Sequence, residues 1–331
     1  MHQHILLSSL GISGPKDLSY TKDGRIEPAA FSSFAIWKLL PESQRPTEIW
    51  FLLTPQARDA AWKSIEEDAT ELGVAVRSID LAANLADDSI EFLELAAGQI
   101  PAECKLTLNV TEGLRHHAFL FYALALYLTT FRRVEIVGAW YCRLETENRD
   151  APKPIIDLKP VLDLAQWFHA LAVFQETGSL RPVSSLVSDN QTRELLRQLS
   201  QFFLTGLPIE AGDAASRIVQ RAADVRLLPD IPLRTELEQH LLEKIMPLAG
   251  TLLDGQSKKN VLLDRKEIHR QAEFIRKYFE TDQLNLALGL SREWIVNVLM
   301  QNTAATNSWL ERTTRESVER AIGGLDIIHR D

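Results

Sequence analysis

The chain has little cysteine, no excess of positive charge and no long apolar run. Its 331 residues include only two cysteines, Cys104 and Cys142, both in predicted strands and without ligand-like spacing to the histidines. This scarcity excludes a disulfide framework and argues against a zinc site. We expect both thiols to be reduced and buried, and we expect no metal.

The missing apolar run and the missing positive charge limit what the protein contacts. No window reaches the roughly 18 uninterrupted apolar residues that a membrane helix needs. The N-terminus, MHQHILLSSLG, has no basic region before its short apolar stretch, unlike a signal peptide. We therefore expect a soluble, cytoplasmic protein that binds no membrane. The net charge of -9 disfavours broad electrostatic binding of a nucleic acid, so a nucleotide ligand needs a local pocket.

The sequence also lacks the usual phosphate-binding loops. The first predicted strand runs into SSLGISGP, which has neither the G-x-G-x-x-G spacing of a dinucleotide site nor the Lys of a nucleotide triphosphate loop. We therefore expect no nicotinamide or other cofactor, and an ordinary α/β enzyme acting on a nucleotide is the third and least favoured hypothesis.

Short apolar runs and helical runs alternate over residues 1–150. HILLSSLG, EIWFLLTP, VAVRSIDL, CKLTLNVT and VEIVGAWYC are typical of strands buried on both faces. Helical spacing of apolar residues falls at 29–40, 56–72, 87–97 and 114–130. This alternation predicts an α/β fold, a Rossmann-like parallel sheet with its ligand crevice at the carboxyl ends of the strands.

Residues 151–331 carry a different pattern. The charged, Pro-rich stretch ENRDAPKPIIDLKP is interpreted as a linker that ends at a helix start, with Asp157 near the cap and Pro160 in the first turn. No convincing strand follows. We predict a second, all-helical domain with further helices near residues 188–205, 210–226, 234–248, 262–280, 282–300 and 304–322.

Three polar junctions follow predicted strands of the sheet. They are SSLGISGP, LLTPQA and NVTEGLRHH, the last placing Thr, Glu, Gly, Arg and two His between a buried strand and a buried helix. Such junctions expose backbone N–H groups at a positive helix end, where an anionic ligand is stabilised. Since strands of a parallel sheet end at one edge, the three junctions predict one shared site.

Several motifs resemble those of one family. The ILLSSLG strand, a T-x-G-[LF]-R turn opening an apolar helix, the VGAWY strand, PIIDLKPVLDLAQWFHALAVFQETG and QLNLALGLSREWIVNVL occur in the order and spacing of CRISPR-associated Rossmann fold (CARF) proteins. The resemblance is to the branch in which a CARF domain precedes a helical HEPN domain, the accessory effectors of type III systems. It covers residues from about 4 to 300.

The resemblance implies a ligand and a partner. Members of this family form homodimers through their Rossmann domains and bind a cyclic oligoadenylate, a tetra- or hexaadenylate, across the two-fold axis. By position, the ligand-binding residues here are Gly11, Ile12, Ser13, Thr54, Thr111, Glu112, Gly113, Leu114 and Arg115. Glu112 departs from the His or Asn that the family often has, which leaves base contacts and ring cleavage open. His116 and His117, in the first turn of the next helix, are weaker candidates.

The resemblance also implies a reaction in the helical domain. HEPN ribonucleases cut single-stranded RNA with an R-x(4-6)-H motif, whose Arg and His act on one phosphate. Here Arg320 and His329 are separated by eight residues, although Gly323 and Gly324 could break the last helix and fold His329 back. Arg234 and His240 in RTELEQH have a fitting spacing but lie early in the domain.

Other charged residues of the helical domain fit structural roles better. Arg265 and His269 share one helix side, and Arg292 with Glu293 is expected to form a structural ion pair beside Trp294. Two functions stay open: a ligand-activated endoribonuclease with weak or absent activity, or a non-catalytic sensor or regulator that responds to cyclic oligoadenylate with a degenerate HEPN domain.

Overall fold

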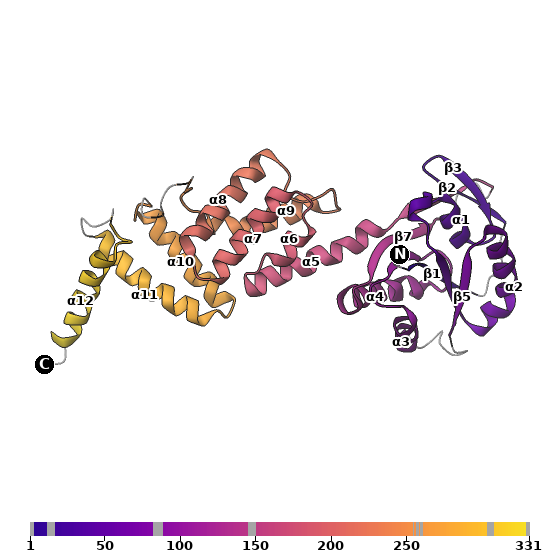
Figure 1. Ribbon diagram of the computed structural model, residues 1–331, viewed down its shortest axis with the longest axis horizontal. Helices are drawn as coiled ribbons and strands as arrows, with labels where there is room; N and C mark the ends of the chain where they lie inside the picture. Colours follow the sequence, from indigo (N-terminus) through magenta and orange to yellow (C-terminus); the bar gives the residue numbers. More distant parts are fainter. Residues whose placement is uncertain are drawn as a thin grey trace. The chain divides into compact units, whose positions relative to one another are not determined.

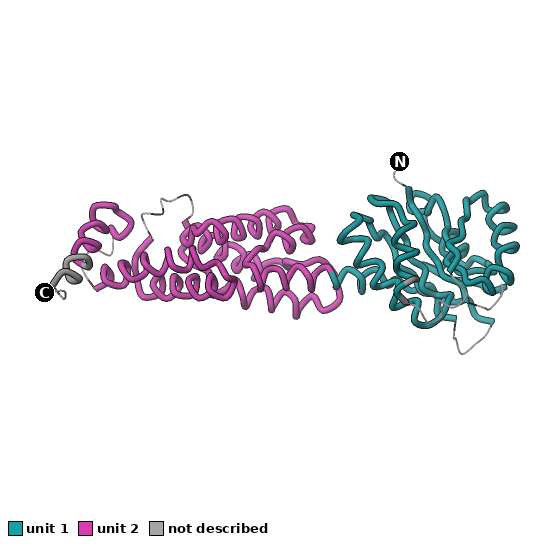
Figure 2. The backbone as a smooth tube through the Cα atoms, turned by 90° about the horizontal axis from the view of Figure 1, so that it is seen from below, with its two compact units in different colours: residues 1–165 teal, residues 166–331 magenta. Residues whose placement is uncertain are grey.

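The computed structural model describes residues 3–11, 17–81, 89–144, 150–253, 255, 258, 261–302 and 308–328. Contacts divide the chain into two compact units, Met1–Ala165 and Gln166–Asp331, which Figure 2 shows in different colours. We refer to them as the N-terminal unit and the helical unit. No described helix has the length and apolar character required to cross a membrane.

The N-terminal unit is an α/β fold built on one mostly parallel sheet of eight strands in the order β3-β2-β8-β7-β6-β1-β4-β5. The strands are β1 His4–Leu10, β2 Leu18–Lys22, β3 Arg25–Ala29, β4 Glu48–Leu53, β5 Ala75–Asp80, β6 Lys105–Asn109, β7 Glu135–Cys142 and β8 Lys153–Asp157. The five strands predicted from apolar runs are β1, β4, β5, β6 and β7, and they pair in parallel. Their order, β5-β4-β1-β6-β7, runs outward from β1 in both directions, as in doubly wound sheets.

Three further strands were not predicted, and they extend the sheet beyond β7. β2 and β3 form an antiparallel hairpin whose turn, Asp23 and Gly24, has φ of 51° and 78°. An Asp-Gly pair with positive φ is the usual signal of a tight hairpin, so this one was detectable in the sequence. The stretch interpreted as a linker contains β8, which pairs antiparallel with β7 and parallel with β2. Without β8, the backbone of β7 would be an unpaired edge.

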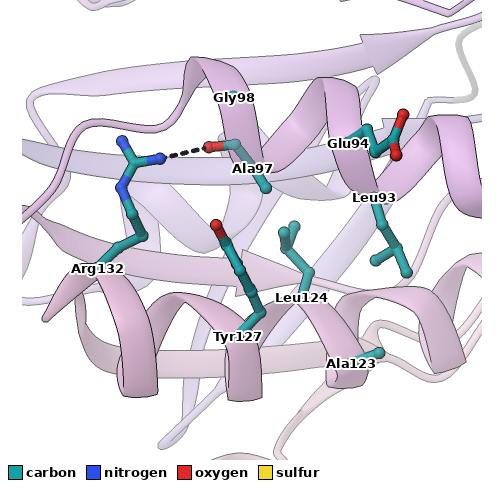
Figure 3. Close-up of a pocket in the computed structure, with 8 residues that line it drawn as sticks. All are labelled: Leu93, Glu94, Ala97, Gly98, Ala123, Leu124, Tyr127 and Arg132. Carbon is teal, nitrogen blue, oxygen red and sulfur yellow. Dashed lines mark hydrogen bonds between the residues drawn. The ribbon is translucent and has the colours of Figure 1, made fainter.

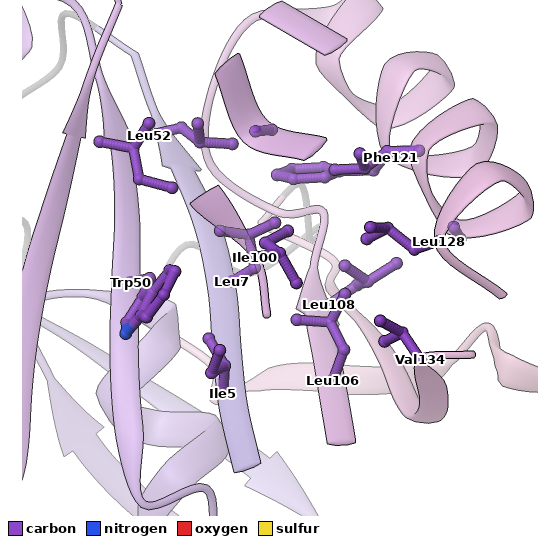
Figure 4. Packing of buried hydrophobic residues seen from close by; sticks show 14 of the residues in the cluster. Ile5, Leu7, Trp50, Leu52, Ile100, Leu106, Leu108, Phe121, Leu128 and Val134 are labelled. Carbon is purple, nitrogen blue, oxygen red and sulfur yellow. The ribbon is translucent and has the colours of Figure 1, made fainter. Parts of the chain in front are cut away.

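Helices cover both faces of the sheet (Figure 1). α1 Ser32–Leu39 and α2 Pro55–Leu72 pack on one face, and α3 Ser89–Gln99 and α4 Arg115–Arg132 on the other. The core beneath α3 and α4 joins Trp50 and Leu106 of the strands to Phe121 and Leu128 of α4, as Figure 4 shows. Both cysteines are free and buried, as expected.

The helical unit contains no strand among its described residues, as predicted. Its helices are α5 Lys159–Thr177, which begins in the N-terminal unit, then α6 Arg181–Leu186, α7 Asn190–Leu204, α8 Pro208–Asp224, α9 Arg234–Ile245, α10 Arg265–Glu280, α11 Leu284–Gln301 and α12 Arg312–Ile328. The Asp157 carboxylate caps α5, accepting from the Lys159 N–H at 2.8 Å. α12 continues through Gly323 and Gly324, so these glycines do not break the last helix.

Charged side chains are buried inside the helical unit. Glu267 and Arg270, each 5% exposed, form a two-bond ion pair one turn apart on α10, and Arg270 also donates to the Pro208 carbonyl at 2.6 Å. A Cβ on Gly212 or Gly250 would lie 2.6 or 3.0 Å from the Arg270 guanidinium nitrogens. The two glycines therefore leave the room that this buried guanidinium occupies.

Candidate functional site

The topological switch point of the sheet lies between β1 and β6. The chain leaves β1 toward the α1 face and leaves β6 toward the α4 face, so their carboxyl ends open a crevice. A Cβ on Gly11, which follows β1, would lie 3.6 Å from Gly113, which follows β6. The structure thus brings these two predicted residues together. We call Gly11, Asn109 and residues 111–115 the switch-point site; Ile12 and Ser13 lie outside the described residues.

Asn109, the last residue of β6, organises a buried polar cluster. Its Nδ2 donates toward the hydroxyls of Ser8, Ser32 and Ser33 at 3.1, 2.8 and 2.9 Å, and its Oδ1 accepts from the Thr111 N–H at 3.1 Å. Asn109 therefore joins β1, α1 and the turn before α4. We did not single it out from the sequence, where the signal was a lone amide ending an apolar strand.

Two predicted ligand residues make hydrogen bonds within the protein. The Thr111 hydroxyl accepts from the Cys142 N–H at 2.8 Å, and Glu112 Oε1 accepts from the Ser32 N–H at 2.8 Å. Ser32 opens α1, whose N-cap, Phe31, has no side-chain hydrogen bond. Glu112 therefore supplies both the cap and a negative charge to the N-terminus of α1. Burial and the Glu112 charge raise the pKa of the Cys142 thiol to about 12.

Gly113 holds the turn in a conformation that other residues rarely adopt. Its φ is 123°, and a Cβ there would overlap the Ser9 hydroxyl and lie 3.0 Å from His117 Nδ1. The Ser9 hydroxyl donates to the Glu112 carbonyl at 2.9 Å. Glycine is therefore required for this close approach of the turn to β1 and α4.

The turn ends at the N-terminus of α4, where a cation faces solvent. Leu114 is the N-cap and makes no side-chain capping bond. Arg115 is exposed and forms no ion pair with any described residue. His117, in the first turn of the helix, is buried against Phe92 with ring centroids 5.0 Å apart. Burial, with a smaller effect of His116, lowers the pKa of His117 to about 4, so its imidazole is neutral at pH 7.

Thr54 follows β4, the neighbour of β1, and so lies at the same sheet edge. It is the N-cap of α2, and its hydroxyl accepts from the Ala57 N–H at 3.2 Å. The Thr54 side chain therefore caps α2.

Three of the four predicted catalytic residues of the helical unit are described, and each of the three has a separate partner. Arg234 pairs with Asp230 at 3.0 Å, and His240, six residues later on α9, contacts Gln175 of α5. Six residues turn a helix by about 600°, so the two side chains leave α9 in different directions. Arg320 is exposed and lies 3.6 Å from Glu316, while His329 is outside the described residues.

The other charged candidates are structural. Arg292 and Glu293 do not pair with each other; both reach α12, where Arg292 lies 3.5 Å from Glu319 and Glu293 contacts Arg315. Trp294 donates to the Ile268 carbonyl at 2.9 Å. On α10, His269 lies 3.8 Å from Glu273. Among the described residues, no group of His, Cys, Asp and Glu side chains is arranged to hold a metal ion.

Part of the chain is similar to a distant CRISPR-associated protein. No protein-family model matches the chain. Over 100 residues the chain is 22% identical to the CRISPR-associated protein MJ1674 of Methanocaldococcus jannaschii, a stretch that is 30% of this chain and 16% of that protein. The similarity is to a CRISPR-associated protein, and it spans about a sixth of that protein's length.

Proposed function

We propose that the N-terminal unit binds a cyclic oligoadenylate at the switch-point site and that the helical unit responds to this ligand, in a CRISPR-related role. The distant relative named as a CRISPR-associated protein supports the role, and the motifs shared with CARF proteins support the ligand. The observation that carries the proposal is the position of Arg115, an exposed cation at the uncapped N-terminus of α4.

The chemistry of such a ligand matches this arrangement. A ring of phosphodiesters is anionic, and a helix N-terminus with free N–H groups and an adjacent guanidinium stabilises anionic oxygens. Thr111 and Glu112 shape the turn through their bonds to Cys142 and Ser32, and Gly113 allows its close approach to β1. In this proposal Arg115 and the backbone of the turn contact the phosphates, while Thr111 and Glu112 position them.

Titration calorimetry with cyclic tetraadenylate and cyclic hexaadenylate tests the binding step. Arg115→Ala should weaken binding by roughly 10 to 150-fold, because a charge-assisted hydrogen bond contributes about 1.5 to 3 kcal/mol. Lys63→Ala, which removes an exposed cation from α2, is the matched control and should leave affinity unchanged. Equal affinity of the Arg115 variant and the wild type, or no binding of either ring, would count against the site.

The non-catalytic sensor or regulator is the second candidate for the helical unit. It is favoured by the separate partners of Arg234 and His240, which leave no assembled Arg–His pair among the described residues of one chain. A single-stranded RNA incubated with protein and ligand should stay largely intact. Strong ligand-dependent cleavage that is lost with His240→Ala would instead establish a HEPN-type ribonuclease using α9.

Pairing of two copies through α4 is part of the proposal. α4 is apolar on both sides, and Phe119 and Phe131 are each 73% exposed although its inner face is in the core. Beside them, α3 and α4 form a groove of about 390 Å³, lined by Leu93, Glu94, Ala97, Gly98, Ala123, Leu124, Tyr127 and Arg132 (Figure 3). An aromatic ridge next to an apolar groove is self-complementary under a two-fold axis.

Light scattering tests the pairing. The wild type should be a dimer at micromolar concentration, and Phe119→Lys should be a monomer, because the interface would then bury a charge. Ile26→Lys, a change of an exposed apolar side chain on β3, should leave the dimer intact. A monomeric wild type with and without ligand would exclude a shared two-fold site.

A further inference from the structure

The N-terminal unit has a polar pocket at the amino ends of β1 and β6. The pocket has a volume of about 240 Å³ and is lined by His4, Leu40, Ser43, Gln44, Lys105, Thr107, Val137 and Trp140. His4 begins β1 and Lys105 begins β6, whereas the switch-point site lies where these two strands end. We call it the amino-end pocket. Its volume is below the roughly 300 to 1,000 Å³ of sites for drug-sized ligands, so it fits a smaller molecule.

One wall of the amino-end pocket depends on an irregularity of β7. Leu106 pairs with Ile136 and Thr107 with Gly138, so Val137 is an extra residue of β7 at this point. Such a bulge re-aims the neighbouring side chains, and it is uncommon between parallel strands. A Cβ on Gly138 would lie 2.7 Å from Trp140 Nε1 and 3.4 Å from Thr107 Cγ2. Glycine at position 138 therefore leaves the room in which the indole lies beside Thr107.

Two hydrogen-bond donors of the lining have no acceptor in the protein. Trp140 Nε1 is buried and has no hydrogen-bond partner among the described residues. Lys105 is exposed and forms no ion pair with any described residue, although Glu135 lies opposite it on β7. A buried N–H without an acceptor is unfavourable, so an acceptor atom placed in the pocket would be stabilised.

His4 shapes the pocket without adding a charge. Its Nε2 lies 2.9 Å from the Thr107 hydroxyl. Burial, with a smaller effect of Lys105, lowers the pKa of His4 below its ordinary 6.5, so the imidazole is neutral at pH 7. Lys105 is therefore the cation of the lining, and Leu40 and the Trp140 indole give it apolar surface.

We infer that the amino-end pocket binds a small acid, a molecule with a carboxylate or phosphate group on an apolar body. The anionic group would bond to Lys105, and an oxygen of the ligand would supply the acceptor that Trp140 Nε1 lacks. The apolar body would lie against Leu40 and the indole. Because the pocket and the switch-point site lie at opposite ends of β1 and β6, this inference does not rest on the proposed function.

NMR of the tryptophan side chains in the full chain tests the inference. The chain has seven tryptophans, and the indole N–H signal of Trp140 is the one that disappears in Trp140→Phe. Benzoate and phenyl phosphate are the probes, and each should shift this signal saturably. Dissociation constants on the order of millimolar are expected for ligands of so few atoms. Benzamide, which has the shape of benzoate without its charge, should leave the signal in place.

Charge variants of the pocket sharpen the test. Lys105→Ala should weaken binding of both acids about tenfold, because a charge-assisted hydrogen bond is lost. Glu135→Gln removes a nearby negative charge and should strengthen binding about twofold. Lys63→Ala, which removes an exposed cation from α2, is the matched control and should leave both affinities unchanged.

The outcomes decide both the site and the group that it binds. A shift of the Trp140 signal by one acid alone supports the inference and identifies carboxylate or phosphate as the bound group. No shift by either acid, an equal shift by benzamide, or an unchanged affinity of Lys105→Ala would overturn it. Circular dichroism verifies that each variant is folded. Titration with cyclic oligoadenylates is a separate measurement, so failure of either site is seen independently of the other.

Discussion

The buried polar cluster at the switch point and the buried cluster around Arg270 are built from different side chains. At the switch point of the sheet, the amide of Asn109 is surrounded by the hydroxyls of Ser8, Ser32 and Ser33. In the helical unit, the cluster on α10 contains a buried ion pair, in which Arg270 donates to Glu267. A neutral cluster stays folded without a counter-ion, whereas a buried charge depends on its partner.

A second difference concerns which cations are available to bind an anion. Several cations of the helical unit have carboxylate partners, such as Arg315 with Glu293 and Arg234 with Asp230. At the switch-point site, Arg115 has no such partner among the described residues, and the only carboxylate of the turn, Glu112, bonds to α1. The switch-point site therefore has an exposed cation without a carboxylate partner among the described residues.

The largest effect is expected from a variant that disrupts the charged cluster. Glu267→Leu should lower the free energy of unfolding of the helical unit by about 4 kcal/mol, because Arg270 stays buried without its partner. Urea unfolding followed by circular dichroism measures the loss. Glu316→Gln removes an exposed partner of Arg312 and should cost less than about 1 kcal/mol. Equal effects of the two variants would show that the Glu267 pair is not buried in solution.

The next largest effect is expected from a variant that disrupts the turn at Gly113 in the N-terminal unit. Gly113→Ala should lower the free energy of unfolding of this unit by about 3 kcal/mol, since it combines a positive φ with overlap at Ser9. Gly98→Ala is the matched control: on α3 its Cβ meets nothing within 4 Å, and alanine favours the helix. The comparison is made by urea unfolding, and a Gly113→Ala protein as stable as wild type would contradict the described turn.

A pH effect follows from the buried His117. Its pKa of about 4 is below the ordinary 6.5, so the folded state binds fewer protons than the unfolded state between these values. Stability is therefore full above pH 6.5 and falls by roughly 2 to 3 kcal/mol as the pH drops to 4. In the His117→Leu variant, the free energy of unfolding measured across this pH range should lose that part of its pH dependence. The exposed neighbour offers a control, since His116→Gln should retain it.

The smallest effect concerns the cap of α1. Glu112→Gln keeps an oxygen near the Ser32 N–H but removes the charge, and should lower the free energy of unfolding by about 1 kcal/mol. Glu66→Gln on the exposed side of α2 should be neutral in the same urea experiment. A Glu112→Gln variant as stable as the wild type would show that the hydrogen bond alone, without the charge, stabilises the N-terminus of α1.

Sequence patterns predicted the parts of the fold that are set by local periodicity. The five parallel strands and the helices between them follow from apolar runs, and the edge that gathers Gly11 and Gly113 follows from their topology. β8 was missed because Lys153–Asp157 becomes a strand only by pairing with β7, a contact between distant residues. For the same reason the direction of the Glu112 carboxylate, toward α1, was not predictable from the turn that contains it.

The strand order has a consequence for unwanted association. The outermost strands are β3 and β5, and an edge strand ordinarily offers its free backbone groups to any other extended chain. β3 carries the charged Arg25 and Glu27 followed by Pro28, which has no N–H to donate, and β5 carries Arg77 and Asp80. Both borders thus resist templated sheet growth. Crowded copies of this protein should therefore meet helix to helix, without fusing their sheets into fibrils.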